Sequence, residues 1–323
     1  MTCVHVSVLM NQNVLFIGAV SSVIHTSNLV RFLSTRSLNR FNFPVLKVLN
    51  NFSSVIIPAM SSSSDAVNNG NVIEKAKRLA AIKAVDNHVK TGDVVGVGSG
   101  STIVYAVTRL AERVKEEKLS IQCIPTSFQA KQLILENGLN LSSLEVMPYH
   151  CNVAIDGADE ADDSLTLIKG GGGCLAQEKI IAENSDLFVM IADERKKSQK
   201  LGTSWQKGVP IEVLPLSYKP IQFSIQKRFG GTPNLRMAKA KAGPVVTDNG
   251  NFILDWVFDL GEVRERTNSS NDEEDFNLWH KVNTELCCMA GVVDTGLFVS
   301  MAKVAYFGTA EGNVIEVDKR QES

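Results

Sequence analysis

Residues 155–173, IDGADEADDSLTLIKGGGG, form the stretch around which the rest of the chain is organised. It places two carboxylates three residues apart, Asp156 and Asp159, ahead of an apolar run, Lys169 and four consecutive glycines. The helical pattern CLAQEKIIAEN follows. Asp-Gly pairs are common turn formers and glycine runs are often flexible loops, so either half alone carries little weight. Together, the acids, the base and the bare backbone at strand ends indicate a site for a small anionic or polyhydroxy substrate.

The composition is that of an ordinary globular protein. The chain has 323 residues, 44% apolar and 21% charged, and a formal net charge of -2, so no basic field favours nucleic acid or a membrane surface. Its six cysteines form no CxxC pair, which favours a reducing compartment, and its five histidines are scattered. We therefore expect no metal site, no cofactor, and neither a nucleic acid nor a membrane as partner.

Residues 1–70 are predicted to be a leader and linker outside the folded part. Residues 1–60 contain no Asp or Glu, but they contain scattered basic residues and many Ser and Asn. This composition is typical of a transit peptide, whereas the apolar run VLFIGAV is too short to span a bilayer. The sequence predicts import into a chloroplast. A mitochondrial address, a disordered extension and a cytoplasmic form starting at Met60 stay open.

An anion-binding loop is predicted upstream of the central stretch. DVVGVGSGSTIVYAVTRLAERVKEE has the pattern of a strand, a tight loop and a helix from about residue 103 to 116. Backbone N–H groups, hydroxyls and the positive end of the helix would converge on one point, which suits a phosphate. The loop consists of Ser99, Gly100, Ser101 and Thr102.

Other interpretations of this loop fit less well. The glycines at 96, 98 and 100 suggest a dinucleotide fingerprint, but Ser101 stands where the third glycine is required. The next strand, SIQCIPTS, ends without a ribose-binding acid, and no Lys-Ser or Lys-Thr follows as in a Walker A loop. An NAD-dependent enzyme is disfavoured, while a plain strand-to-helix turn stays open.

Strand and helix patterns alternate through the first half of the chain. A helix at residues 72–90 and the strand VVGVG are followed by SIQCIPT, the helix SFQAKQLILENG, the strand-like LSSLEVM, and the buried strand LFVMIAD. The alternation predicts an α/β fold, with a doubly wound, Rossmann-like parallel sheet at residues 71–208. Ligands bind at the carboxyl ends of such strands, where SGST, DGAD and KGGGG all fall.

The second half predicts a smaller, inserted α+β domain near the C-terminus, at residues 209–290. VPIEVLP precedes the helix-like KPIQFSIQKRFGG, and FNLWHKVNTELCCMAG is a second helix. Between them, GPVVTDNGNFILDW is interpreted as a β-hairpin that turns at Asn249 and Gly250. Residues 291–323 return to the main domain as short strands and a polar tail.

Glu178, in the helical pattern that follows the glycines, adds a further carboxylate near the central stretch. A carboxylate beside an ammonium suits proton abstraction next to a carbonyl: Lys169 would stabilise the enolate oxyanion while the carboxylate moves the proton. Taken alone, Glu178 has the pattern of a solvated helix residue.

The joint motif set resembles type A ribose-5-phosphate isomerase. The motifs are VGVGSGST, IDGADE, LIKGGGG and QEK, then MIADERKKS, GGTPNLRM, GPVVTDNGNFILDW and GVVDTGLF, over roughly residues 72–317. The resemblance implies interconversion of D-ribose 5-phosphate and D-ribulose 5-phosphate through an enediolate, without metal or nucleotide. This step belongs to the non-oxidative pentose phosphate pathway and, in a plastid, to the Calvin cycle. A homodimer or higher homo-oligomer is implied; a non-catalytic sugar-phosphate sensor is the alternative.

The same resemblance implies roles for individual residues. Glu178 matches the proton-transferring base and Lys169 the oxyanion partner, while Asp156 and Asp159 match acids that serve ring opening and orient hydroxyls. The implied substrate-binding residues are Ser99, Gly100, Ser101, Thr102, Gly157, Ala158, Gly170, Gly171, Gly172 and Lys196.

A few positions leave the family pattern or stay ambiguous. A basic residue of the first helix binds phosphate in the family, and Lys77 and Arg78 both fit. Gln177 stands where Arg is usual, Cys174 where Ser or Ala is common, and Ala310 where Pro is common.

Overall fold

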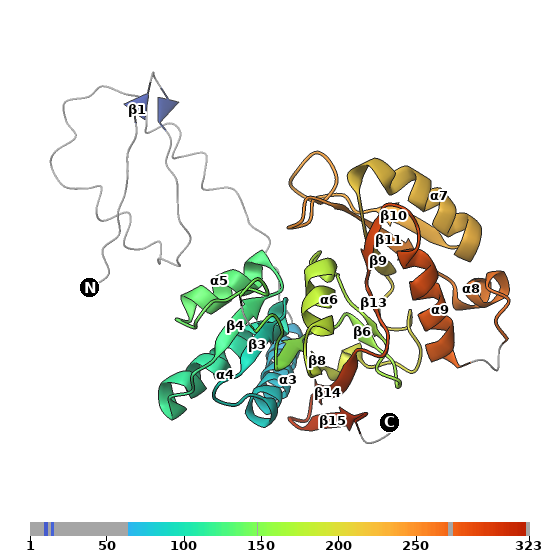
Figure 1. Ribbon diagram of the computed structural model, residues 1–323. Helices are drawn as coiled ribbons and strands as arrows, with labels where there is room; N and C mark the ends of the chain where they lie inside the picture. Colours follow the sequence, from blue (N-terminus) through green and yellow to red (C-terminus); the bar gives the residue numbers. More distant parts are fainter. Residues whose placement is uncertain (1–9, 12–13, 16–63, 147, 271–273, 321–323) are drawn as a thin grey trace. The chain divides into compact units, whose positions relative to one another are not determined.

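The computed structural model describes residues 10–11, 14–15, 64–146, 148–270 and 274–320. The chain divides into two compact units, residues 1–61 and residues 62–323. In the first unit, β1 (Met10–Asn11) and β2 (Val14–Leu15) pair antiparallel (Figure 1). Residues 64–70 of the predicted leader and linker instead begin a helix, and the remaining residues of that segment lie outside the described ones. Every other helix and strand among the described residues lies in the second unit.

The second unit is built on a six-stranded sheet with the order β15-β14-β8-β5-β3-β4. It is parallel except for the antiparallel edge strand β15, so the predicted Rossmann-like sheet is confirmed. Its strands are β3 (Val94–Val97), β4 (Gln122–Pro125), β5 (Val153–Asp156), β8 (Phe188–Asp193), β14 (Ala302–Gly308) and β15 (Val314–Asp318). The helices packed on it are α3 (Ser64–His88), α4 (Ser101–Glu117), α5 (Phe128–Glu136) and α6 (Leu175–Glu183).

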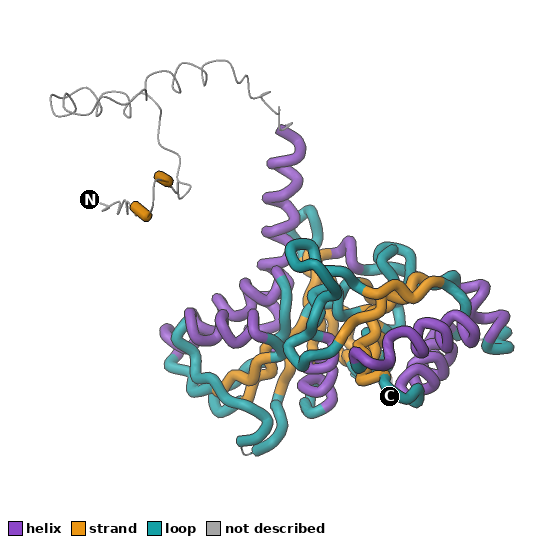
Figure 2. The backbone as a smooth tube through the Cα atoms, turned by 90° about the horizontal axis from the view of Figure 1, so that it is seen from above, coloured by secondary structure: helices purple, strands orange, loops and turns teal. Residues whose placement is uncertain are grey.

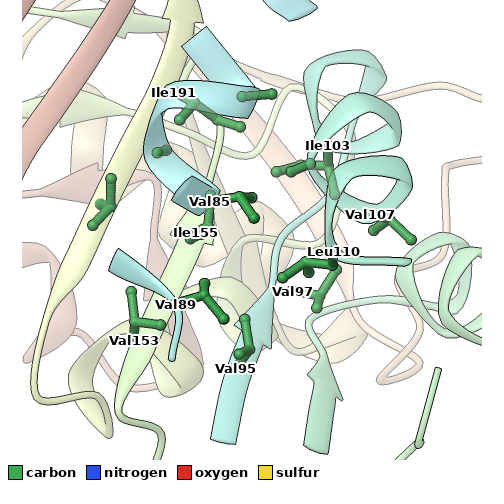
Figure 3. Close-up of a cluster of buried hydrophobic side chains, with 14 of the residues drawn as sticks. Val85, Val89, Val95, Val97, Ile103, Val107, Leu110, Val153, Ile155 and Ile191 are labelled. Carbon is green, nitrogen blue, oxygen red and sulfur yellow. The ribbon is translucent and has the colours of Figure 1, made fainter. Parts of the chain in front are cut away.

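Successive side chains of a strand point to opposite faces of the sheet, so the two faces pack against different helices. Figure 3 shows Val95 and Val97 of β3 beside Val85 of α3 and Leu110 of α4. On the opposite face, Met190 of β8 packs in a second cluster that includes Ile181 and Ala182 of α6. Helices on both faces are what a doubly wound sheet requires.

A short three-stranded sheet joins two segments: the chain between β5 and α6, and the chain that returns from the small domain to β14. Its order is β13-β7-β6, with antiparallel pairing throughout. Its strands are β6 (Glu160–Ala161), β7 (Leu167–Ile168) and β13 (Leu297–Phe298). Lys169, just after β7, donates its N–H to Gly296 O at 2.8 Å, so the chain returning from the small domain fixes the backbone of this lysine.

The smaller domain is a four-stranded antiparallel sheet with the order β10-β11-β9-β12 and three helices. Trp256 and Trp279 are fully buried in its core. Figure 1 shows it beside α6, and Figure 2 shows the strands of the second unit inside a shell of helices and loops. Its elements are β9 (Val209–Val213), α7 (Tyr218–Phe229), β10 (Thr232–Leu235), β11 (Phe252–Val257), α8 (Leu260–Arg266), α9 (Asp275–Cys287) and β12 (Val292–Thr295). Two 3-10 turns complete the unit, η2 (Glu194–Lys196) and η3 (Pro215–Ser217).

The hairpin predicted at GPVVTDNGNFILDW is wrong. β11 pairs antiparallel with β10 and β9, and upstream of it Pro244 makes one isolated bridge to Met237. The turn itself is present, closed by Gly250 N donating to Thr247 O at 2.9 Å. Pro244 has no N–H for a ladder, and the more distant β10 supplies the partner that local pattern could not reveal.

Two further expectations need correction. Among the described residues of LSSLEVM, Leu141 forms a bridge to Cys123 and the rest form turns or irregular backbone. The sheet of the small domain also extends past residue 290, because β12 pairs with β9 before the chain returns to the main sheet.

Candidate active site

The strand order creates a crevice between β3 and β5. The chain leaves β3 toward β4 on one side and later enters β5 on the other, and ligands bind at such switch points. Gly98 follows β3 and donates its N–H to Ile155 O at 2.9 Å. A Cβ on Gly98 would lie 2.1 Å from Asp156 Oδ1, so the close approach of the two strand ends depends on this glycine.

A cleft of about 370 Å³ opens at this crevice. That volume suits a small-molecule ligand. Every site residue expected from the sequence lines it except Asp156, which is buried behind Lys169; their roles stay predictions. The lining residues are Lys77, Ser99, Gly100, Ser101, Thr102, Gln129, Gly157, Ala158, Asp159, Lys169, Gly170, Gly171, Gly172, Cys174, Glu178, Ala192, Asp193, Arg195 and Lys196.

The predicted anion loop forms one end of the cleft. α4 begins at Ser101, inside this loop and earlier than the predicted residue 103, so the unpaired N–H groups of its first turn belong to the loop. Lys77 of α3 donates to Ser101 Oγ at 3.0 Å and lines the cleft, so of the two basic candidates the structure brings in Lys77 and leaves Arg78 outside the lining. The Ser99 hydroxyl faces inward and donates to Ser127 Oγ at 2.6 Å.

A buried charge cluster forms the floor. Lys169, Asp156 and Glu178 are exposed by 2%, 3% and 6%. Lys169 Nζ lies 3.0 Å from Asp156 Oδ2 and 3.5 Å from Glu178 Oε1, and it donates to Gly157 O at 2.6 Å. Asp156 Oδ1 accepts the N–H groups of Ser99 and Gly157. Glu178 Oε2 has no hydrogen-bond partner among the described residues.

The charge cluster shifts the pKa of Glu178 and that of Lys169. Burial and then the negative charge of Asp156 raise the pKa of Glu178 to about 8, against the attraction of Lys169. Burial opposes the charged form of Lys169, but the carboxylates of Asp156 and Glu178 outweigh it and raise the lysine's pKa. With its pKa raised to about 8, the carboxyl of Glu178 is suited to exchange a proton close to neutral pH.

The glycine run is tied to Asp159. Gly171 N–H donates to Asp159 Oδ2 at 2.6 Å. Burial raises the pKa of Asp159, while the bond from Gly171 and the charge of Lys169 oppose the rise. A Cβ on Gly171 would lie 2.5 Å from Asp159 Oδ1 and 2.8 Å from Trp205 Cη2. Lys196 Nζ stands 5.3 Å from the centroid of the Trp205 ring, so one tryptophan packs on the glycine run and orients a lysine of the cleft.

Sequence reasoning missed the support that the small domain gives to this run. Arg236 Nη1 donates to Gly170 O at 3.0 Å and to Gly171 O at 3.2 Å. Arg236 Nε is held by Asp255 Oδ2 at 2.8 Å. Gln129, Asp193 and Arg195 also line the cleft without having been singled out; the only signal for Arg236 was its place in GGTPNLRM.

The departures from the family pattern lie around the cluster. Cys174 lines the cleft at the start of α6, where burial raises the pKa of its thiol to about 12. Gln177 donates to Asn249 Oδ1 at 2.8 Å. Ala310 N–H donates to Glu194 Oε1 at 2.7 Å, beside the η2 turn. Cys174 therefore lines the cleft, Gln177 and Ala310 each have a hydrogen-bond partner, and none of the three stands in the place of Glu178.

Metal-ligating clusters and membrane-spanning helices are both absent from the described residues. No group of three or more His, Cys, Asp or Glu side chains is placed to hold a metal ion within them. No helix in that part of the chain is both long and apolar enough to cross a membrane.

An α/β sheet that gathers a glycine-containing loop, a buried lysine and two buried carboxylates around a cleft at its switch point defines a class of protein: an enzyme that acts on a small molecule. Comparison with known proteins narrows this class. The family model for ribose 5-phosphate isomerase A (phosphoriboisomerase A) matches residues 122–312. The ribose-5-phosphate isomerase of Sus scrofa is 54% identical over 259 residues, covering 80% of this chain and 77% of that protein. The Homo sapiens protein is 53% identical over 262 residues, covering 81% and 77%.

Solved structures agree. Ribose 5-phosphate isomerase A from Methanocaldococcus jannaschii has a TM-score of 0.67 and 36% identity, covering 76% of this chain and 99% of that one. The Plasmodium falciparum enzyme has a TM-score of 0.67 and 33% identity, covering 77% and 100%. A D-ribose-5-phosphate isomerase in complex with phospho-erythronic acid matches with a TM-score of 0.67 and 36% identity, covering 76% and 99%. The chain belongs to the ribose 5-phosphate isomerase A family.

Proposed function

We propose that this chain interconverts D-ribose 5-phosphate and D-ribulose 5-phosphate, with Glu178 as the base and Lys169 as the oxyanion partner. The observation that carries the assignment is the unpartnered, buried Oε2 of Glu178 beside a buried ammonium, in a cleft whose far end is an anion loop. A carboxylate positioned in this way is suited to remove a proton next to a carbonyl.

The residues divide the reaction between them. The phosphate binds the loop at residues 99–102 and Lys77, which leaves the sugar carbons over the floor of the cleft. The carboxylate of Glu178 takes the proton from C2 of the open-chain aldose; the electron pair forms the C1–C2 double bond, and O1 gains a negative charge beside Lys169. The enediolate then takes the proton back from Glu178 at C1, and the O2 proton moves to O1, leaving the ketose. Asp159 is placed to orient hydroxyls and to assist ring opening.

The direct test follows isomerisation in deuterated water. Purified protein with ribose 5-phosphate in EDTA should form ribulose 5-phosphate and incorporate solvent deuterium at C1, because a carboxylic acid exchanges its proton with solvent during the enediolate stage. Absence of interconversion would overturn the function. The amount of deuterium at C1 would measure how often the proton on Glu178 exchanges with solvent before it returns to the sugar.

A second test uses the ligand found in a relative. Phospho-erythronic acid carries a phosphate and a carboxylate, and the two carboxylate oxygens resemble those of an enediolate. We expect competitive inhibition against ribose 5-phosphate, weakened in Lys169→Met because the oxyanion partner is lost. Inhibition that substrate does not relieve would contradict a shared site.

We also propose that the leader directs the chain to a chloroplast, where the reaction would serve the Calvin cycle as well as the pentose phosphate pathway. The support is the absence of acidic residues from residues 1–60. A fusion of residues 1–70 to a fluorescent protein should enter chloroplasts. A mitochondrial or cytoplasmic signal would favour the other addresses, including the start at Met60.

The assembly is proposed to be a homodimer or a higher homo-oligomer that uses the small domain. Its support is the exposed apolar surface there: Leu216 is 95% exposed and Phe223 is 68% exposed. Light scattering on the purified protein should give at least twice the mass of one chain, and Phe223→Ser should lower it.

A further inference from the structure

A tight turn of the small domain reaches across to the helices that frame the cleft. This bridging turn, residues 247–251, is closed by Gly250 N donating to Thr247 O at 2.9 Å and by Thr247 N donating to Asn251 O at 2.9 Å. The Thr247 hydroxyl accepts the N–H of Asn251 at 3.1 Å. None of its residues lines the cleft.

A buried acid anchors the turn. Glu212 of β9 is fully buried, and its Oε1 accepts from Thr247 Oγ1 at 2.8 Å and from Asn251 Nδ2 at 2.8 Å. Asn249 Nδ2 adds a third, longer bond at 3.3 Å. A carboxylate that accepts several hydrogen bonds in a buried site fixes the groups around it, so the turn is a rigid part of the small domain.

One tip residue of the turn holds the anion-loop side of the cleft. Asp248 Oδ2 accepts the backbone N–H of Phe128 at 2.8 Å, at the first residue of α5. A negative charge is favourable at a helix N-terminus. Ser127, the N-cap of this helix, accepts the hydrogen bond from the Ser99 hydroxyl. Two hydrogen bonds therefore connect Asp248 to the anion loop: one from Phe128 N–H to Asp248, and one from Ser99 to Ser127, the residue next to Phe128.

The other tip residue holds the side of the cleft that carries the base. Asn249 Oδ1 accepts from Gln177 Nε2 at 2.8 Å, and Gln177 directly precedes Glu178 in α6. The same carboxamide thus donates to buried Glu212 and accepts from Gln177, which connects the core of the small domain to the turn of helix that carries Glu178.

We propose that Asp248 and Asn249 are positioning residues for the isomerisation: the bridging turn sets the distance between the anion loop and Glu178. The proposal rests on the proposed function, since it assigns a task to residues that touch neither substrate nor Glu178 itself. A displacement of about 1 Å at a reacting group costs up to a hundredfold in rate, so hydrogen bonds this close to Glu178 matter for turnover.

A double-mutant cycle tests the link to the base. Asn249→Ala and Gln177→Ala should each lower kcat roughly fivefold, the loss expected for one hydrogen bond, with KM unchanged. Both changes remove the bond between Gln177 and Asn249, and Asn249→Ala also removes the longer bond to Glu212, so the double variant should lose no more than Asn249→Ala alone. Glu183→Ala, an exposed change at the other end of α6, is the matched control. Effects that multiply in the double variant, or losses that appear in KM alone, would overturn the link.

The link to the anion loop has its own pair of variants. Asp248→Ala should raise KM several-fold because the start of α5 loses its acceptor, while Asp248→Asn, which keeps an oxygen for Phe128 N–H, should restore most of the affinity. Equal KM values for Asp248→Ala and the wild type would contradict this half of the proposal.

Amide hydrogen exchange tests the role of the bridging turn independently of the proposed isomerase activity. In Asn249→Ala and Asp248→Ala, amides in the first turns of α6 and α5 should exchange faster, while those of α9 should not change. Unchanged protection in α5 and α6 overturns the inference even if the chain proves to have another activity. An active wild type with a dead Glu178→Gln variant and an additive cycle overturns the inference and leaves the proposed function standing.

Discussion

Glu178 acquires its chemistry from its surroundings and not from its place in the pattern. On a solvated helix face this residue would be an ordinary carboxylate, but the glycine run brings the start of α6 over Lys169 and buries the side chain to 6% exposure. Glu178→Gln keeps the size of the group and removes its basicity. Turnover of ribose 5-phosphate should therefore fall roughly a hundredfold or more.

The matched control is Glu183→Gln at the exposed end of the same helix, and it should keep wild-type kinetics. Steady-state measurement of ribulose 5-phosphate formation compares the two variants directly. Turnover of Glu178→Gln within a few-fold of the wild type would show that another group carries the proton.

The pH dependence of the reaction follows from the same residue. A base acts in its deprotonated form, and the pKa of Glu178 is raised to about 8 by burial and by Asp156. The value of kcat/KM should therefore rise with pH and level off above about 8. The substrate phosphate ionises near pH 6 and adds a separate, lower step.

A second variant assigns the upper step. In Asp156→Asn one repulsive charge is gone and Lys169 is left to pair with Glu178, so the upper step should move to lower pH even if the maximum rate falls. Profiles measured from pH 5.5 to 9.5 would separate the two cases. A flat wild-type profile between pH 6.5 and 9 would contradict the assignment of the base.

At the scale of elements, the glycine run behaves as a fitted part and not as a flexible loop. Gly171 lies against Asp159 and Trp205, and a Cβ there would lie 2.5 Å from Asp159 Oδ1, whereas a Cβ on Gly172 would meet nothing within 4 Å. Gly171→Ala should lower the free energy of unfolding by about 1–3 kcal/mol, the usual cost of overpacking. It should also raise KM, because Asp159 must move.

Gly172→Ala is the comparison for this element, since it adds the same methyl group one residue away. Its denaturant midpoint should stay close to that of the wild type, while the midpoint of Gly171→Ala falls. Equal midpoints for the two variants would mean that the run adapts freely, and the idea of a fitted element would fail.

For the molecule as a whole, apolar periodicity predicted the α/β sheet and the helices on it. The polar and glycine residues at predicted strand ends predicted the segments that meet at its switch point. Local patterns were sufficient there because β3 and β5 and their loops follow the rules of parallel sheets. They did not reveal pairings between distant segments: β11 with β10, Arg236 with the carbonyls of the glycine run, and Asp248 with the start of α5. The choice between Lys77 and Arg78 likewise depended on the rotation of α3 about its axis, which its packing against α4, β8 and β14 fixes.

The division of the chain gives the last prediction. All the residues that line the cleft, and all the described strands of both larger sheets, lie in the unit of residues 62–323. A chain that begins at residue 62 should therefore show the same kcat, the same KM and the same unfolding midpoint as the full chain. Matched preparations can be compared by steady-state kinetics and by denaturant unfolding monitored through Trp256 and Trp279, which are buried in the small domain. A lower kcat or a lower midpoint in the shortened chain would mean that residues 1–61 contribute to the catalytic unit, and the leader would then have a task beyond addressing the protein.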